Sequence, residues 1–272
     1  MNLLYANDKR GTYPPSWYAA TATPLTAFET LKGAQKANVC VIGAGYTGLS
    51  AALHLAQAGR DVILLDAQRV GFGASGRNGG QLGSGQRMEQ DALEAQMGDP
   101  EAAKLWSLAE DAKSLVKSLI AEHKIDCHLK PGVAWTGSTG RDVRHLHSYA
   151  DHLAQKYGYS DIETLDNVAL QSVCRSPDYC GGILDMGAAH LHPLNYALGL
   201  ARAAKTAGVR IFERSAVHHI DEGTPATVRT DAGHVIADHV VLACNGYLGG
   251  LNRKVAARVM PINNFIIATE PL

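Results

Sequence analysis

The sequence predicts an α/β fold built around a parallel sheet, because a strand, a helix and a second strand follow one another within about 30 residues. Residues 39–43, VCVIG, form a short apolar run that is typical of a buried strand. Residues 46–58 carry apolar side chains at helical spacing, and residues 61–66, DVILLD, form a second apolar run. Two strands joined by a helix in this way lie parallel in one sheet.

The composition points to a folded protein with small-molecule partners. The chain has 272 residues, of which 46% are hydrophobic and 19% are charged, so it can bury a sizeable core. Its 25 basic and 26 acidic residues leave a net charge of −1. That balance gives no electrostatic attraction to nucleic acid or to an anionic membrane, and we expect neither as a partner.

The cysteines and the N-terminus favour a cytoplasmic protein. The five cysteines are an odd number, contain no CxxC pair and lie mostly in apolar runs, which fits a reducing compartment. The first residues, MNLLYANDKRGTYPPSWY, lack the apolar segment of a signal peptide. No later run approaches the roughly 20 apolar residues that a membrane-spanning helix needs.

The middle of the chain predicts a second domain. An amphipathic helix is expected over 101–123, with Leu105, Leu108, Ala112, Leu115 and Leu119 facing inward. A strand at 133–137, a helix at 142–157 and a strand at 181–185 follow, without any nucleotide-binding pattern.

The last third of the chain returns to alternating helix and strand. A helix is expected to begin at Pro193 and to end before Gly208. Apolar runs then predict strands at 209–213, 216–220, 226–230, 234–237 and 239–244, with a turn at 231–233.

A glycine pattern stands between the first strand and the first helix. Gly43, Gly45 and Gly48 form G-x-G-x-x-G, which allows a tight turn, approach of a pyrophosphate to the backbone, and close packing of helix on strand. Asp66 ends the second strand 18 residues after Gly48. Its carboxylate can accept both hydroxyls of an adenosine ribose and would repel a 2′-phosphate, so the pattern predicts a Rossmann-like site for FAD or NAD.

A second glycine-rich stretch follows at 71–86, GFGASGRNGGQLGSGQ. Glycines weaken regular structure, so a cluster of them indicates either a flexible linker or a backbone pressed against a flat ligand. Because Arg77 and Asn78 lie among the glycines, the ligand interpretation is favoured. The peptide N–H groups of this stretch would then meet the ring of a flavin.

These segments resemble a known family. Residues 39–66 together with RVGFGASGRNGGQ are similar to the FAD-dependent amine oxidoreductases of the D-amino-acid, glycine and sarcosine oxidase superfamily, most closely the γ-glutamylputrescine oxidoreductases. Further similar segments follow in the same order along the chain: SWYAATA, IDCHLKPG, HLHPLNYALG, SAVHHI, TPATVRT and VMPINNFIIATEPL.

The resemblance implies a set of FAD-binding residues. Those at the pyrophosphate and ribose are Gly43, Gly45, Tyr46, Thr47, Gly48, Asp66 and Ala67. Those along the pyrophosphate and isoalloxazine are Ser75, Gly76, Arg77, Asn78, Gly79, Gly80 and Gln81, with Val217 at the adenine and Ala243 on the far side. His192 and Gln81 are candidates for a role beside the substrate.

The resemblance also implies a domain plan and a reaction. We expect an arm (1–36), two parts of an FAD-binding domain (37–98 and 187–256), an interleaved α+β substrate domain (99–186), and the start of its next segment (257–272). Relatives continue beyond the equivalent of Leu272, so a truncated chain is expected, completed in cis or in trans. The reaction would oxidise an amine to an imine, which water hydrolyses to an aldehyde and ammonia.

Another amino-acid or amine oxidase of the same superfamily is an alternative, and the residues bear on three further interpretations. The histidine pairs His145/His147, His190/His192 and His218/His219 suggest a metal, yet no cysteine or carboxylate adds a ligand at matching spacing, and we expect none. An NAD-dependent dehydrogenase would share the first βαβ unit but would continue with further βαβ repeats. A non-catalytic product of truncation would bind flavin without turning over a substrate.

Overall fold

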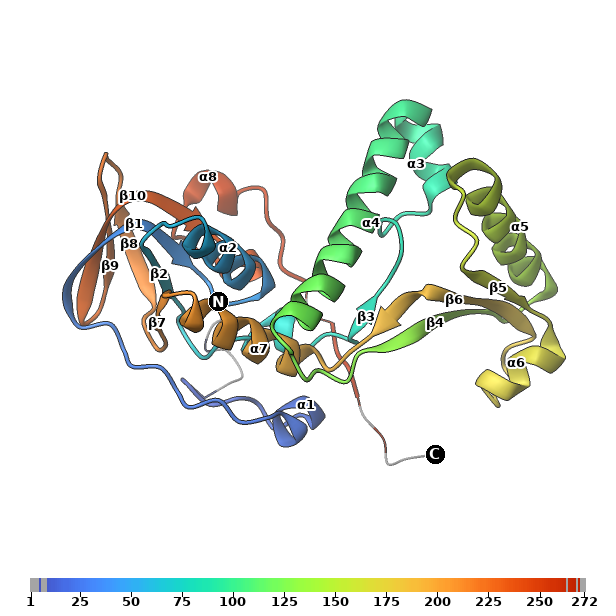
Figure 1. Cartoon of the computed structure of the whole chain (residues 1–272), viewed down its shortest axis with the longest axis horizontal. Helices are drawn as coiled ribbons and strands as arrows, with labels where there is room; N and C mark the ends of the chain where they lie inside the picture. The colour runs from blue at the N-terminus through green and yellow to red at the C-terminus, as the bar shows by residue number, and fades with distance from the viewer. Residues whose placement is uncertain (1–4, 6–8, 263, 268, 270–272) are drawn as a thin grey trace. The chain divides into compact units, whose positions relative to one another are not determined.

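The computed structural model describes residue 5, residues 9–262, residues 264–267 and residue 269 (Figure 1). Two compact units are built from interleaved segments. The first unit contains the described residues up to Gly79, residues 122–127, and the described residues from His192 onward. The second unit contains residues 80–121 and 128–191.

A six-stranded sheet of the described residues forms the centre of the first unit, in the order β7-β2-β1-β10-β9-β8. Its strands are β1 (Gly33–Ile42), β2 (Val62–Leu65), β7 (Arg210–Phe212), β8 (Val217–Asp221), β9 (Ala226–Thr230) and β10 (Gly233–Leu242). β7, β2, β1 and β10 run parallel, whereas β9 is antiparallel to β10 and β8 to β9. The predicted α/β fold with a parallel sheet is confirmed.

Two strand boundaries differ from the prediction. β10 is one continuous strand, where Asp238 between two apolar runs had predicted two. Asp238 does not break the strand because its side chain is exposed and accepts a hydrogen bond from Asn38 Nδ2 on β1. β1 begins at Gly33, six residues before the apolar run starts at Val39, because its first half pairs with the start of β10.

The core of the first unit consists of aliphatic side chains from both halves of the chain. This core includes Cys40, Ile63, Val228 and Val235, which are fully buried. Cys40 packs in the core as a small apolar residue. Helix α2 (Tyr46–Gln57) packs on β1, β2 and α7 (Pro193–Thr206), and both helices match the predicted ranges. Short elements complete this unit: α1 (Trp17–Thr21), η1 (Ala74–Gly76), η2 (Asn245–Tyr247) and α8 (Arg253–Ala256).

The second unit combines an antiparallel sheet with helices. β6 (Gly181–His190) pairs with β3 (Gln81–Leu82), β4 (Lys130–Gly137) and β5 (Ile162–Leu165). Its helices are α3 (Gln90–Met97), α4 (Asp99–Glu122), α5 (Gly140–Tyr157) and α6 (Asn167–Val173). The sequence patterns indicated α4, α5, β4 and β6, but not the short elements α3, β5 and α6.

The compact units divide the chain near the boundaries expected for the domains but not at them, and the domain plan itself stays a prediction. The first division lies after Gly79 rather than after residue 98, because β3 pairs with β6 and α3 packs on α5. The last division lies after Leu191 rather than after residue 186, because β6 continues to His190.

The buried face of α4 was predicted only in part, since Leu119 is buried as expected. Leu108 and Leu115 are 60% and 44% exposed, whereas Trp106 and Lys113 are buried. The ammonium of Lys113 lies 2.7 Å from Glu110 Oε2 and 2.8 Å from Ser84 Oγ. A lysine buried by polar partners cannot be found from apolar spacing, so the predicted face is rotated from the one that is buried.

Among the described residues, no helix combines the length and the apolar character that crossing a membrane requires.

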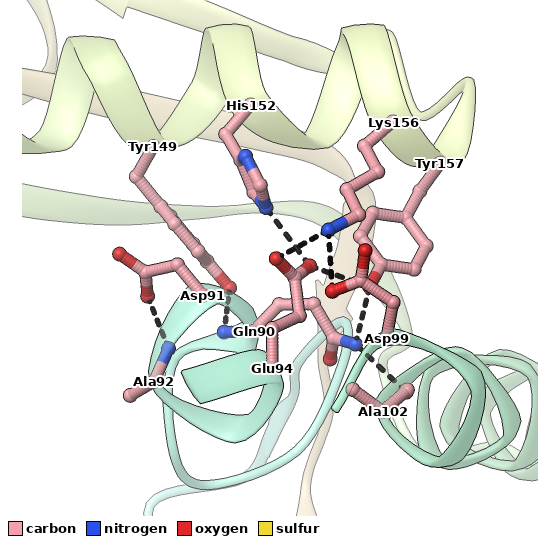
Figure 2. A network of polar contacts seen from close by, with 10 residues as sticks. All are labelled: Gln90, Asp91, Ala92, Glu94, Asp99, Ala102, Tyr149, His152, Lys156 and Tyr157. Atoms are coloured by element: carbon pink, nitrogen blue, oxygen red, sulfur yellow. Dashed lines mark hydrogen bonds and ion pairs between the residues drawn. The ribbon is translucent and has the colours of Figure 1, made fainter. Parts of the chain in front are cut away.

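A polar network joins α3 to α5 in the second unit (Figure 2). The carboxylate of Glu94 on α3 accepts hydrogen bonds from Lys156 Nζ at 2.6 Å and Tyr157 OH at 2.6 Å, and it contacts His152 Nε2 at 2.9 Å. Burial acts to raise the pKa of Glu94, but the hydrogen bonds from Lys156, Tyr157 and His152 outweigh it and lower that pKa to about 2. Glu94 is therefore an ionised anchor between two helices.

Replacing Glu94 tests this anchor. A carboxyl whose pKa falls on folding stabilises the fold above its unfolded-state pKa and loses that contribution as the pH drops. Glu94→Gln should lower the free energy of unfolding by about 1–3 kcal/mol at pH 7. The difference from the unsubstituted chain should shrink as the pH falls from about 5 to about 2, in urea denaturation at each pH.

Glu101→Gln is the matched control, because Glu101 pairs with Lys104 on the exposed surface of α4. Equal pH dependence in Glu94→Gln and the unsubstituted chain would contradict the assignment.

Gly48 sets how closely α2 lies against the end of β1. A Cβ placed on Gly48 would stand 1.8 Å from the carbonyl oxygen of Gly43. A Cβ on Gly45 would meet the hydroxyl of Ser75 at 2.9 Å, and that hydroxyl can rotate away. Gly48→Ala should therefore lower the free energy of unfolding by about 3 kcal/mol or more, and Gly45→Ala by about 1 kcal/mol. Equal denaturation midpoints for the two variants would show that α2 can shift freely.

Candidate functional site

A pocket opens in the first unit where the parallel strands β1, β2 and β10 end. The carboxyl ends of neighbouring parallel strands are the usual ligand site of open α/β sheets. The pocket is lined by residues from these ends and the loops after them: Ile42, Gly43, Gly45, Tyr46, Thr47, Asp66, Ala67, Gln68, Phe72, Gly73, Ala74, Ser75, Ser215, Val217, Ala243, Cys244, Asn245, Tyr247, Leu248 and Leu251.

The first glycine turn brings backbone to the pocket. Gly43 has a φ of 110°, and a Cβ there would lie 2.5 Å from the carbonyl oxygen of Ala243. Gly45 is the N-cap of α2 and offers no side chain, while Ser75 Oγ accepts the N–H of Tyr46 at 3.0 Å. The N-terminus of α2 therefore faces this site with peptide N–H groups and the positive end of its dipole, which suits a pyrophosphate.

Asp66 is fixed at the end of β2 by its own loop. One carboxylate oxygen accepts the N–H of Ala44 at 2.7 Å, and the other accepts the N–H of Gln68 at 2.7 Å. Burial raises the pKa of Asp66 to about 6, against the lowering effect of these two hydrogen bonds, and the charge of Glu213 raises it further. Each carboxylate oxygen has a second lone pair, so Asp66 can also accept two hydroxyl groups.

The glycine-rich stretch divides between two roles. Ser75 lines the pocket, and so do the preceding residues 72–74. Arg77 donates to the carbonyl of Phe72 at 2.7 Å and stands over its ring, and Asn78 donates to the carbonyls of Ala74 and Ser75. These two side chains therefore hold the turn and are not among those that line the pocket. Gly76 is buried, and a Cβ there would meet the carbonyl of Gly71 at 2.2 Å.

The other predicted residues lie outside the pocket. Gly79 ends its segment of the first unit, whereas Gly80 and Gln81 belong to the second. There Gly80 accepts the N–H of Leu191, and Gln81 pairs with His190 in the sheet. Gly48 packs helix on strand. A role of Gly79, Gly80 and Gln81 at a flavin stays a prediction.

His192 caps helix α7. Its Nδ1 accepts the N–H of Asn195 at 3.1 Å, so in the neutral ring the proton lies on Nε2, which is 3.1 Å from Thr21 Oγ1. The ring is 7% exposed and stands edge-on to Tyr18. Both ring nitrogens thus have structural partners, and a role of His192 beside the substrate stays a prediction.

Sequence reasoning missed several lining residues. Gln68 and Ser215 come two residues after the strands predicted at 61–66 and 209–213. Ser215 precedes Val217 by two positions, so the side chains of Ser215 and Val217 lie on one side of an extended chain. Tyr247, Leu248 and Leu251 come within a few residues of the end of the strand predicted at 239–244. The thiol of Cys244 also lines the pocket, and burial raises its pKa to about 11, so it is neutral there.

These features fit a dinucleotide. The glycine turn and the start of α2 suit the pyrophosphate, Asp66 suits a ribose, and the apolar side chains from the β10 end supply a surface for a flat ring. Among the residues that the structure describes, no group of three or more His, Cys, Asp or Glu side chains could hold a metal ion.

Comparison with known proteins agrees with this geometry. A sequence profile described as DAO, FAD dependent oxidoreductase, matches residues 38–272. The chain is 41% identical over 258 residues to the γ-glutamylputrescine oxidoreductase of Escherichia coli and, equally, to the probable oxidoreductase OrdL of Rhizobium meliloti. Each alignment covers 94% of this chain and 60% of the relative.

Solved structures show the same fold at lower identity. Glycine oxidase from Geobacillus kaustophilus superimposes with a TM-score of 0.66 at 20% identity, over 81% of this chain and 58% of that one. An L-amino acid deaminase from Proteus vulgaris, lacking its specific insertion, gives a TM-score of 0.68 at 19% identity, over 90% and 62% of the two chains.

The chain spans about 60% of the length of the curated relatives that it matches. The profile nevertheless covers all but the first 37 residues, and every residue that lines the pocket lies within it. The expected resemblance is confirmed: the chain belongs to the DAO family of FAD-dependent oxidoreductases.

Proposed function

We propose that this chain carries the FAD site of an oxidoreductase that acts on amines, with γ-glutamylputrescine or a similar amine as substrate. The observation that carries the proposal is the pocket itself, where the glycine turn, the start of α2 and Asp66 meet at the carboxyl ends of three parallel strands. The identity of 41% to γ-glutamylputrescine oxidoreductase supports the substrate class.

The residues of the chain would bind and orient the cofactor. The N–H groups at the start of α2 would hold the pyrophosphate, and Asp66 would accept the hydroxyls of the adenosine ribose. Val217 lines the pocket beside Ser215 and suits the adenine. When bound, FAD supplies the electron acceptor for oxidation of the amine to an imine, which water hydrolyses to an aldehyde and ammonia. Oxygen or another acceptor would then reoxidise the flavin.

The proposed setting is the cytoplasm. All five cysteines are free thiols, which supports a reducing compartment.

Reconstitution tests the cofactor and the substrate. The chain purified from an expression host and incubated with FAD should retain flavin through gel filtration, measured by its visible absorption, and should not retain NADH. Anaerobic addition of γ-glutamylputrescine should bleach that absorption, whereas glycine should not. Retention of NADH without flavin would favour a dehydrogenase instead. Retention of flavin without bleaching by any amine would favour a non-catalytic fragment.

Asp66 gives a sharper test of the ribose position. Asp66→Asn should weaken FAD binding by roughly 1–3 kcal/mol, because a charged acceptor is lost and an amide N–H₂ faces a backbone donor. Since burial raises the pKa of Asp66 to about 6, FAD affinity in the unsubstituted chain should decrease as the pH falls below about 6. Asp66→Asn should lose that pH dependence, as measured by titrating flavin fluorescence.

Asp61→Asn is the matched control, because Asp61 precedes the same strand, is exposed and pairs with Arg210. Unchanged affinity in Asp66→Asn would mean that the ribose lies elsewhere.

A further inference from the structure

The loop that carries Asp66 is held from outside the pocket. Asp66 donates its N–H to the carbonyl of Phe212 at 2.9 Å, and its carbonyl accepts the N–H of Ser215 at 2.8 Å. Two residues later, the carbonyl of Gln68 accepts the N–H of Arg214 at 2.9 Å. The loop 66–70 therefore runs beside residues 212–215 and takes its position from them.

Glu213 is the centre of this contact. Its side chain is fully buried, and one carboxylate oxygen accepts the N–H of Val70 at 2.8 Å. The other oxygen accepts the N–H of Phe28 at 3.0 Å and lies 2.7 Å from Arg69 Nε. A buried carboxylate is costly unless it is paired and hydrogen-bonded, so these contacts must be kept together for the charge to remain buried.

Residues of the N-terminal arm also form hydrogen bonds with the loop 66–70. Tyr13 OH donates to the carbonyl of Val70 at 2.6 Å, and its ring lies beneath the guanidinium of Arg69 at 5.1 Å. Arg69 also donates to the carbonyl of Leu25 at 3.1 Å, and the side-chain oxygen of Gln68 accepts the N–H of Gly11. Three successive residues of the loop are thus bound by the arm.

The arm lies before the part of the chain that the family profile matches. The family profile begins at residue 38, whereas the arm contacts come from residues 11–28. Other arm contacts reach α7, where Thr23 donates its N–H to Asn195 and Thr21 Oγ1 lies beside His192. Those from residues 11–28 to the loop fall on three of the four residues that follow Asp66.

We propose that Glu213, Arg69 and the arm residues Gly11, Tyr13, Leu25 and Phe28 form a brace that positions Asp66 for the adenosine ribose. The proposal rests on the proposed function, since it assigns the ribose to Asp66. Glu213 and Tyr13 are positioning residues: they act through the loop 66–70 and are not among the residues that line the pocket.

The test uses the full chain and ADP, which carries the adenosine and pyrophosphate of the cofactor without the flavin. Glu213→Gln removes the charge and places an N–H₂ group against backbone donors. It should raise the Kd for ADP about tenfold, within the range for coupled residues. Tyr13→Phe removes the single hydroxyl that binds Val70 and should raise the Kd about threefold, which keeps the test available if Glu213→Gln does not fold. Asp61→Asn, which breaks the exposed pair with Arg210, should leave the Kd unchanged.

A double-mutant cycle separates positioning from mere stabilisation. If Glu213 acts through Asp66, Glu213→Gln should change the Kd less than about twofold in an Asp66→Asn background. An equal fold-change in both backgrounds would overturn the proposal, because Glu213 would then act on the ligand by another route.

Hydrogen exchange of the ligand-free chain measures the stability of the loop 66–70 without any ligand, and so tests the brace separately from binding. Glu213→Gln should speed exchange of the amides in residues 66–72 about tenfold, and leave α5 in the second unit unchanged. Unchanged exchange at 66–72 would overturn the brace, and faster exchange with an unchanged Kd would overturn its role in binding. If the unsubstituted chain binds neither ADP nor FAD while exchange responds as expected, the proposed function fails and the brace stands as a structural device alone.

Discussion

The parallel pairing of β1 with β10 determines the geometry of the pocket. Residues 33–42 pair with residues 233–242, in register from Gly33 with Gly233 to Ile42 with Leu242. Both strands therefore end at the same level, and the carbonyl of Ala243 comes to lie where a side chain on Gly43 would have to be. The glycine turn, the start of α2 and the residues after β10 are brought together by this one register.

Two partly buried carboxylates differ in pKa because their hydrogen-bond partners differ. Glu94 receives hydrogen bonds from a lysine, a tyrosine and a histidine, and its pKa falls to about 2. Asp66 receives two neutral backbone N–H groups, and burial raises its pKa to about 6. A carboxylate saturated with side-chain donors is suited to holding helices together. One that keeps free lone pairs at a pocket is suited to receiving a ligand.

Local patterns in the sequence predicted the parts of the structure that depend on local physics. The strand of residues 39–43, the helix from Tyr46 and Asp66 at a strand end all follow from spacing and glycine geometry within a few residues. The burial of Lys113 and the contact of Glu213 with Phe28 depend on residues far apart in the chain, so no local window contains them. The pairing of β3 with β6, which moved the division between the units, is of the same kind.

The order in which these strands are synthesised gives the pairing of β1 with β10 a further consequence. All strands of the second unit have been synthesised once His190 has been made, so its sheet can form as they emerge from the ribosome, while the chain is still growing. The sheet of the first unit has to wait, because β10 ends at Leu242 and stands between β1 and β9. During that interval the apolar edge of β1 has no neighbour on one side, and closing so long a loop is slow. The nascent chain is therefore exposed to wrong strand pairing, and to chaperones, for as long as ribosomes take to read from β1 to β10.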